Sequence, residues 1–581
     1  MCGIAGVMMR SGGAPDAGVL AKLRGGIAHR GPDGEGQWLS GGVAVMQARL
    51  AIVDLVSGDQ PFFAPGGQVL VGNGEIYNNP ELRAAMAGTP FRTLSDNEPP
   101  LFLYAAHGLD FARYLRGMWA LAIYDPGRAR LVLSRDPFGI KPLYYVETSE
   151  AFAFASEPAA LLAAGFAARA VDPRQQAELL QLKFTTGVET IFPGVMRVLP
   201  GETLAIENGR IVERCKRAAL PDGGPRASAT IAALEQVLLD SVSVHLRSDV
   251  PYGLFLSGGI DSASVLALMR RATGQRIAAI TCGWENGDGV DESAEAMRLA
   301  SVMGADCHRI AMGAADFWNL APRIAAAIDD PTADAAVLPT WLLGRAARAQ
   351  GLKVTLCGEG ADELFGGYSR YRKQRPPLSW FSRKPRSKGA LGAQPNLLGW
   401  RDGIAAWEAD AMPDRSAVQR AQAIDIAEWL PNDLLTKLDR CLMVHGVEGR
   451  TPFLDPVVAD FAFRLPDAQK VGLRFGKLLL RDWLAQAFPE AGAYARKKGF
   501  KPPVGTWMQA RAGELVPLLA AQPGIAACIA PDFVQATFAT AAQESQRAWS
   551  LLFYALWHSH HILGLPSDGD IGAVLTAASR Y

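Results

Sequence analysis

The sequence predicts two domains of different fold class, an α+β domain over residues 2–207 followed by an α/β domain with a parallel sheet and added helices over residues 228–581. The chain of 581 residues exceeds what one hydrophobic core usually fills. Residues 221–225 contain two prolines and two glycines and interrupt the apolar pattern between the two parts. Beyond them, short apolar runs alternate with segments of helical spacing, which is typical of parallel strands joined by helices.

Periodicity and turn residues place the main elements of both parts. In the first part, apolar runs predict strands at residues 118–124, 131–134 and 152–154, and the prolines and glycine of residues 136–143 predict a turn. The elements predicted for the second part are helices at 231–246, 260–272 and 292–303 and strands at 253–256, 277–282 and 354–357.

The composition disfavours several kinds of partner. The 58 basic and 58 acidic residues cancel, so no net charge recruits nucleic acid or an anionic membrane. No apolar segment of about 18 residues and no signal-peptide pattern occurs, which predicts a cytoplasmic protein without a membrane partner. The seven cysteines lack paired spacing, as expected in a reducing compartment. The sequence leaves a monomer and a homodimer open.

A cysteine at position 2 has a chemical option that other cysteines lack. If Met1 is removed, Cys2 carries a thiol and a free α-amine, and an amine that titrates near pH ~8 is suited to act as the base for its own side chain. Taken alone, Cys2 is weak evidence, because many proteins have a cysteine there by chance.

Polar residues further along the first part strengthen that interpretation. The Asn73 amide beside the Gly74 backbone N–H is the donor pair that an oxyanion hole needs. Arg49 is suited to bind a carboxylate and Asp96 to bind an amine. An amide, a carboxylate and an amine together describe glutamine.

The sequence S-G-G-I-D-S at residues 257–262 lies between a predicted strand and a predicted helix. Glycine N–H groups, serine hydroxyls and a helix N-terminus all favour bound phosphate. Asp261 would repel phosphate unless a divalent cation lay between them, so we expect Mg²⁺ there. An ordinary glycine-rich turn is the alternative for this motif alone.

A second motif, G-E-G-A-D-E at residues 358–363, follows the strand predicted at 354–357. Its three carboxylates repel one another unless a cation or a proton transfer occupies them. In isolation, a solvated helix start explains them better. In one sheet with residues 257–262, they become the second half of a metal–nucleotide site.

With these motifs, residues 1 to about 205 resemble a class II glutamine amidotransferase domain, which is an N-terminal-nucleophile hydrolase. The resemblance implies an αββα sandwich in which the nucleophile uses its own amine as base. The residues it implies are Cys2, Asn73 and Gly74 for catalysis, and Arg49, Asn73, Gly74, Glu75 and Asp96 for binding glutamine.

The second part resembles the asparagine synthetase domain, a member of the PP-loop ATP pyrophosphatase group. The likeness continues through residues 330–334, 446–455, 477–481 and 498–500. The roles it implies are a general base for Glu359, neutralisation of phosphate charge for Lys477, ATP binding for Leu256, Ser257, Gly258, Gly259, Asp261, Ser262, Cys282, Cys357 and Gly358, and Mg²⁺ binding for Asp261 and Asp362. Cys357 stands where serine is usual, which puts only the local polarity in doubt.

Together the two resemblances imply a glutamine-hydrolysing asparagine synthetase that uses glutamine, ATP and Mg²⁺. L-Aspartate is the acceptor that the resemblance implies, while a sugar acid, a peptide or a modified amino acid is the alternative. A non-catalytic binding relative is disfavoured because the reactive residues of both motifs are present. We also expect an apolar passage that carries ammonia between the two sites.

Two further clusters have ordinary structural explanations. The basic residues within 370–388 surround prolines and predict a solvated loop rather than a polyanion site. His558, His560 and His561 lie among leucines at helical spacing, and their own spacing does not place them on one face. A core helix is therefore favoured over a metal site.

Overall fold

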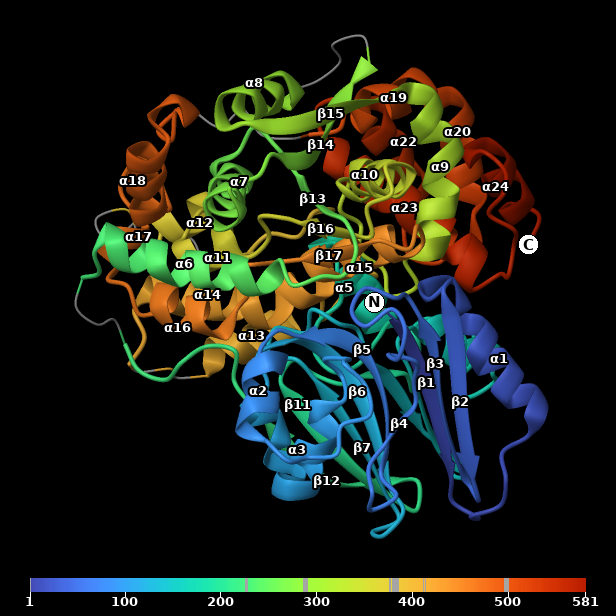
Figure 1. The fold of residues 1–581 in the computed structure, drawn as a ribbon. Coiled ribbons are helices and arrows are strands. Elements are labelled where there is room, and N and C mark those ends of the chain that lie inside the picture. Colours follow the sequence, from blue (N-terminus) through green and yellow to red (C-terminus); the bar gives the residue numbers. More distant parts are fainter. Residues whose placement is uncertain are drawn as a thin grey trace.

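The computed structural model describes residues 2–224, 228–285, 291–375, 378, 386–410, 412, 414–495 and 501–581. These residues form two domains that lie against each other. In Figure 1 the N-terminal domain is blue to teal, and the C-terminal domain, green to red, covers one end of it. The predicted motif at residues 498–500 lies outside the described residues.

The N-terminal domain contains two six-stranded antiparallel sheets. The first has the order β10 (Met196–Arg197), β8 (Tyr144–Glu147), β9 (Ala151–Ala155), β1 (Cys2–Met9), β3 (Val43–Arg49), β2 (Gly34–Ser40). The second has the order β12 (Arg210–Lys216), β11 (Glu202–Glu207), β7 (Arg130–Arg135), β6 (Gly117–Asp125), β5 (Val69–Ile76), β4 (Phe62–Phe63). The three strands predicted here are confirmed as parts of β6, β7 and β9.

The two sheets face each other across an apolar core and carry helices on their outer faces. Ile4, Val71 and Phe154 are fully or almost fully buried between the sheets. The helices of this domain are α1 (Ala17–Ile27), η1 (Ala28–Arg30), α4 (Pro158–Ala163) and α5 (Pro173–Leu182) beside the first sheet, and α2 (Asn79–Ala85), α3 (Pro99–His107) and η2 (Gly108–Tyr114) beside the second. This arrangement confirms the predicted αββα sandwich.

Two turns shape the second sheet. The buried Asp136 carboxylate accepts hydrogen bonds from the backbone N–H of Ile140 at 2.9 Å and of Lys141 at 3.0 Å, so residues 136–143 form the predicted turn. Asn208 and Gly209 have positive φ values of 49° and 67° and connect β11 to β12. The sheet therefore continues to Lys216, past the expected break at residue 207.

A five-stranded parallel sheet forms the centre of the C-terminal domain, as predicted. Its order is β15 (Ala305–Met312), β14 (Ile277–Trp284), β13 (Tyr252–Phe255), β16 (Val354–Leu356), β17 (Glu448–Arg450). Strands β14 and β15 lie on one side of β13, and β16 and β17, which come later in the chain, lie on the other. The loops that follow β13 and β16 therefore lead in opposite directions. A crevice for ligands is expected between such loops.

Helices cover both faces of this sheet. On one face lie α6 (Ile231–His245), α7 (Ile260–Thr273) and α8 (Ser293–Met303), and on the other lie α10 (Val337–Ala349) and α15 (Thr436–Met443). The other helices among the described residues are α9 (Ala314–Ala327), α11 (Ala361–Phe365), α12 (Ser369–Arg372), α13 (Asp402–Ala409), α14 (Ala417–Ile424), the π-helix η5 (Asp425–Leu435), α16 (Pro456–Phe463), α17 (Asp467–Lys470), α18 (Leu478–Ala487), η6 (Pro489–Ala491), α19 (Val504–Ala510), α20 (Ala512–Ala521), α21 (Pro523–Ala526), α22 (Pro531–Ala539), α23 (Ser545–His561) and α24 (Ile571–Ala578).

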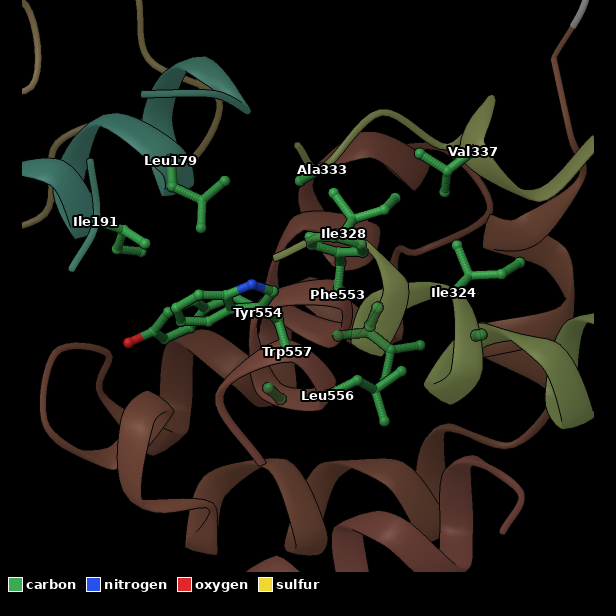
Figure 2. Close-up of a cluster of buried hydrophobic side chains, with 14 of the residues drawn as sticks. Leu179, Ile191, Ile324, Ile328, Ala333, Val337, Phe553, Tyr554, Leu556 and Trp557 are labelled. Carbon is green, nitrogen blue, oxygen red and sulfur yellow. The ribbon is translucent and has the colours of Figure 1, made fainter. Parts of the chain in front are cut away.

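Helix α23 is the predicted core helix, and its apolar cluster joins the two domains. Figure 2 shows Trp557 of α23 beside Leu179 and Ile191 of the N-terminal domain. His558 Nδ1 accepts a hydrogen bond from Gln522 Nε2 at 3.0 Å inside this core. The two domains are thus packed through a shared apolar cluster as well as through polar contacts.

Within the described parts of the chain, every helix is too short or too polar to cross a bilayer.

Candidate active sites

The first candidate site surrounds Cys2 at the start of β1. The backbone nitrogen of Cys2 donates a hydrogen bond to Asn73 Oδ1 at 3.0 Å. The Asn73 Nδ2 atom is buried and has no hydrogen-bond partner among the described residues. Leaving a buried donor unsatisfied costs free energy, so such a group at a nucleophile is suited to bind a developing oxyanion. Gly74 follows Asn73 in β5, and its carbonyl accepts a hydrogen bond from Asn97 at 2.9 Å.

The predicted acidic residues lie in the same region but differ in their partners. Asp96 Oδ2 accepts a hydrogen bond from the Ile76 backbone N–H at 2.6 Å, and burial raises the pKa of Asp96 to about 6. Burial raises the pKa of Glu75 well above its usual value, and its carboxylate lies 3.3 Å from Arg450 of the C-terminal domain. Glu75 is therefore also part of the domain interface.

Arg49 lies opposite Cys2 in the antiparallel pairing of β1 and β3. Its guanidinium forms an ion pair with the exposed Asp59 at 2.7 Å and donates to the carbonyl of Asp54 at 2.5 Å. Asp54 has a φ of 54°, a left-handed conformation that is uncommon outside glycine and clusters at functional sites. A ligand carboxylate would compete with Asp59 for Arg49.

Arg30 completes the surroundings of Cys2 and was missed in the sequence. Its Nε donates a hydrogen bond to the Cys2 carbonyl at 3.2 Å, and its two terminal nitrogens donate to Asp439 of the C-terminal domain at 2.8 and 3.0 Å. Burial raises the pKa of the Cys2 thiol, so the nucleophile needs a base to become a thiolate.

The second candidate site lies in the crevice between β13 and β16. Residues 257–262 turn from β13 into α7, with the hydroxyls of Ser257 and Ser262 3.0 Å apart and the Gly259 N–H bonded to Ser257 Oγ at 3.1 Å. A cavity of 260 Å³ is lined by the predicted Leu256, Ser257, Gly259, Asp261, Ser262, Cys282, Cys357, Gly358, Glu359 and Asp362. Gly258 and Lys477 line an adjoining cavity of 350 Å³. The structure thus brings every predicted residue of this site together.

Lys477 connects the two predicted metal ligands. Its Nζ lies 2.6 Å from Asp261 and 2.7 Å from Asp362. Lys477 has a φ of 57° at the start of α18, a costly conformation for a residue other than glycine. Among the described residues, no group of three or more His, Cys, Asp and Glu side chains could hold a metal. Two neighbouring carboxylates fit Mg²⁺ if substrate phosphates supply the remaining oxygen ligands.

Glu359 is half-buried and lines the same cavity, and its desolvation there raises its pKa. Lys437, which was missed in the sequence, opposes that effect with its positive charge. Its Nζ lies 3.1 Å from Asp334, so α15 presents a buried, paired cation to the cavity. Cys357, which stands where serine was expected, donates its thiol hydrogen to the carbonyl of Arg450 at 3.4 Å.

The expectation of a solvated basic loop is wrong for Arg370. Its Nε donates to Asp425 at 2.6 Å, and its guanidinium lies 4.2 Å from the ring centroid of Trp429. The π-helix η5 supplies both partners, and a basic stretch read by itself does not reveal them. Residues 376–377 and 379–385 of that stretch lie outside the described residues.

Comparison with known proteins assigns both halves of the chain. Residues 1–216 match the family model of a glutamine amidotransferase domain, and residues 233–559 match that of asparagine synthase. The chain belongs to the asparagine synthase family. It is 30% identical to asparagine synthetase [glutamine-hydrolyzing] 1 of Bacillus subtilis over 97% of both chains. It is 28% identical to asparagine synthetase B of Escherichia coli, over 83% of this chain and 78% of that one. Amidase chry2 of Gibberella zeae is 33% identical over 61% of this chain and 56% of its own.

Proposed function

We propose that this member of the asparagine synthase family is a ligase that converts L-aspartate to L-asparagine with glutamine as the nitrogen donor and ATP as the energy source. The observation that carries the proposal is the position of Lys477 between Asp261 and Asp362 at the mouth of the residue 257–262 turn. A phosphate-binding turn with a cation and two carboxylates is suited to expel pyrophosphate.

The glutaminase half-reaction takes place at Cys2. After removal of Met1, the α-amine takes the thiol proton, and the thiolate attacks the amide carbon of glutamine. Asn73 Nδ2 and the Gly74 N–H stabilise the negative oxygen of the tetrahedral intermediate. The carbon–nitrogen bond breaks as the protonated α-amine gives its proton to the leaving nitrogen, so neutral ammonia leaves, and water then hydrolyses the thioester to glutamate and the Cys2 thiol.

The synthetase half-reaction takes place in the cavity between β13 and β16. An oxygen of the acceptor carboxylate attacks the α-phosphorus of ATP, and pyrophosphate leaves. Lys477 neutralises charge on the leaving phosphates, while Asp261 and Asp362 would hold Mg²⁺, which supplies further neutralisation. Ammonia then attacks the acyl-adenylate, Glu359 takes the surplus proton, and AMP leaves.

An apolar cluster shared by the two domains supports an ammonia passage. Leu50 and Ile52 of the N-terminal domain belong to one apolar cluster with Leu256 of the nucleotide cavity. Such surroundings favour neutral ammonia over ammonium, because burying an unpaired charge is costly. We propose that the reaction takes place in the cytoplasm, with glutamine, ATP and aspartate as small-molecule substrates.

A second candidate function differs only in the carboxylic acid that accepts ammonia. Relatives named amidases, from Gibberella zeae and Penicillium rubens, are as similar to this chain over their matched parts as the asparagine synthetases are. The same two half-reactions on a sugar acid, a peptide or a modified amino acid therefore form the second candidate function.

The test measures AMP, pyrophosphate, glutamate and amide in one reaction that contains the purified enzyme, glutamine, Mg²⁺-ATP and an acceptor. With L-aspartate we expect equal amounts of AMP and asparagine. If glutamine is hydrolysed but aspartate gives neither product, a panel of other carboxylic acids identifies the acceptor by its AMP release. If glutamine is not hydrolysed and no acid gives AMP, the proposed function is wrong.

A further inference from the structure

Helix α15 forms a wall that faces both active sites. Lys437 and Leu438 line the nucleotide cavity, where Lys437 pairs with Asp334 at 3.1 Å. Asp439 comes two residues after Lys437 and lies on the opposite side, because residues i and i+2 of a helix do not face the same way. Side chains within one turn of α15 therefore reach the nucleotide cavity on one side and Arg30, which contacts Cys2, on the other.

Asp439 holds the residue that contacts the nucleophile. Its two carboxylate oxygens accept hydrogen bonds from Arg30 at 2.8 and 3.0 Å, and Arg30 Nε donates to the Cys2 carbonyl at 3.2 Å. Both charged side chains are almost completely buried. A bidentate pair fixes orientation as well as distance, so Asp439 holds Arg30 in place together with Glu157, whose carboxylate accepts a hydrogen bond from Arg30 at 2.6 Å.

Arg440 makes a second connection from α15 to the strand of the nucleophile. It bonds to Asp439 at 3.0 Å and to the carbonyl of Ser156 at 3.5 Å. The Ser156 hydroxyl accepts a hydrogen bond from the Ile4 backbone N–H at 2.9 Å. Strand β1 is thus held at Cys2 and at Ile4 by groups that α15 positions.

We propose that Asp439 is a positioning residue for Cys2 and that α15 couples glutamine hydrolysis to the occupancy of the nucleotide cavity. The proposal rests on the proposed function. An anionic ligand in the cavity would add a partner beside Lys437, which is paired with Asp334 at 3.1 Å. That difference in contacts gives the ligand a preference for one position of α15, and the Arg30–Asp439 pair carries the displacement to Cys2.

The test uses Asp439→Asn in the full chain, which keeps the side-chain shape and removes the charge. Glutamine hydrolysis is measured with and without Mg²⁺-ATP plus L-aspartate, and amide formation is measured with ammonium chloride. In the wild type we expect the two substrates to stimulate hydrolysis by about 5-fold or more. In Asp439→Asn we expect this stimulation to disappear, while ammonia-dependent amide formation stays close to that of the wild type.

A matched control separates coupling from a loosened interface. Asp330 also forms a buried bidentate pair across the domains, with Arg197 at 2.7 and 2.9 Å, and its other side-chain contact is Tyr144 rather than Cys2 or α15. Asp330→Asn should keep the stimulation. Arg30→Lys keeps the charge but not the bidentate geometry, and it should lose the stimulation as Asp439→Asn does.

Three results would overturn the proposal: a wild type without stimulation, an Asp439→Asn variant that keeps it, or equal loss in Asp330→Asn. If Asp439→Asn does not fold, Arg30→Lys decides by the same measurement. Failure of the proposed function is distinguishable, because then the wild type produces no glutamate from glutamine or no amide from ammonia.

Discussion

The side chain of Asn73 is divided between two tasks. Its oxygen accepts a hydrogen bond from the Cys2 nitrogen, while its buried Nδ2 atom has no partner in the described part of the chain. The first contact sets the orientation of the amide. The second group is then left to stabilise charge on a substrate oxygen, which is the arrangement that preorganised catalysis requires.

Replacement of the nucleophile should separate the two half-reactions. In Cys2→Ala we expect no glutamine hydrolysis, since no thiolate can form the thioester, and amide formation from ammonium salts close to that of the wild type. Release of glutamate and formation of amide are measured in parallel. Cys528→Ala changes another buried cysteine, which belongs to the apolar cluster of α23 and lines neither cavity of the nucleotide site, and it should keep both activities. Equal loss of both activities in folded Cys2→Ala would contradict the model with two sites.

Asp96 should make glutamine binding sensitive to acid. Burial raises the pKa of Asp96 to about 6, so the carboxyl gains a proton as the pH falls through that value and no longer attracts a cationic amine. We expect the KM for glutamine to rise by about tenfold for each pH unit below 6. Asp96→Asn should have a high KM at every pH, and ammonia-dependent activity serves as the control. A flat KM in the wild type between pH 7 and 5 would argue against this role.

Residue type explains which site residues could be predicted. Cys2, Asn73 and Asp96 carry functional groups whose chemistry matches parts of glutamine. Arg30 and Lys437 are missed because their functions depend on partners that the fold brings close. Arg30, for example, pairs with Asp439, which is 409 positions away. The residues around Arg30 in the sequence give no sign of such a pair, and a buried arginine cannot be distinguished from an exposed one by residue type.

At the scale of elements, regular periodicity was the reliable guide. Helix α7 (Ile260–Thr273) and strand β14 (Ile277–Trp284) agree with their predicted bounds within two residues. The sequence does not predict that helix α15 is buried on every side. Its charged residues Lys437, Asp439 and Arg440 are buried because they form ion pairs with residues from distant segments, and the local pattern gives no sign of those partners.

The cation on α15 should set the pH range of amide formation. Burial raises the pKa of Glu359, and Lys437 lowers it. In Lys437→Met the Glu359 pKa should rise further, so this base is lost at a higher pH. We expect the acidic limb of the rate profile for ammonia-dependent amide formation to move to higher pH, whereas Lys437→Arg should leave it near that of the wild type. An unchanged profile in Lys437→Met would mean that Glu359 is not the base or does not sense Lys437.

At the scale of the molecule, the two domains meet through both charge and apolar contact. Arg30 and Arg197 of the N-terminal domain form buried ion pairs with Asp439 and Asp330 of the other domain. Removing either partner of the Arg197–Asp330 pair would leave the other as a buried charge without that ion pair, at a cost of about 3–5 kcal/mol. The apolar cluster of α23 adds buried apolar surface to the interface and contains no charge that could be left unpaired. The domains should therefore lose their structure together.

Trp557 tests that expectation. Its side chain is completely buried, its indole N–H donates to the Asp329 carbonyl at 3.2 Å, and its ring lies 5.4 Å from that of Phe192 in the N-terminal domain. Trp557→Ala removes the contacts with Phe192 and Asp329 and should lower the free energy of unfolding by about 3–5 kcal/mol. The measurement is the loss of glutaminase and of ammonia-dependent activity after heating, and we expect both to be lost at the same lowered temperature.

The contrasting variant is Phe111→Ala, which removes an aromatic ring of the N-terminal domain that is equally buried but belongs to the outer cluster beneath α3. Because the domains are expected to unfold as one unit, this variant too should lose both activities at the same lowered temperature, although its cavity does not adjoin the other domain. If Trp557→Ala instead lost only ammonia-dependent activity and kept the wild-type temperature for glutaminase, the N-terminal domain would be stable without the shared core. The interface would then serve to align the two sites and would contribute little to the free energy of folding.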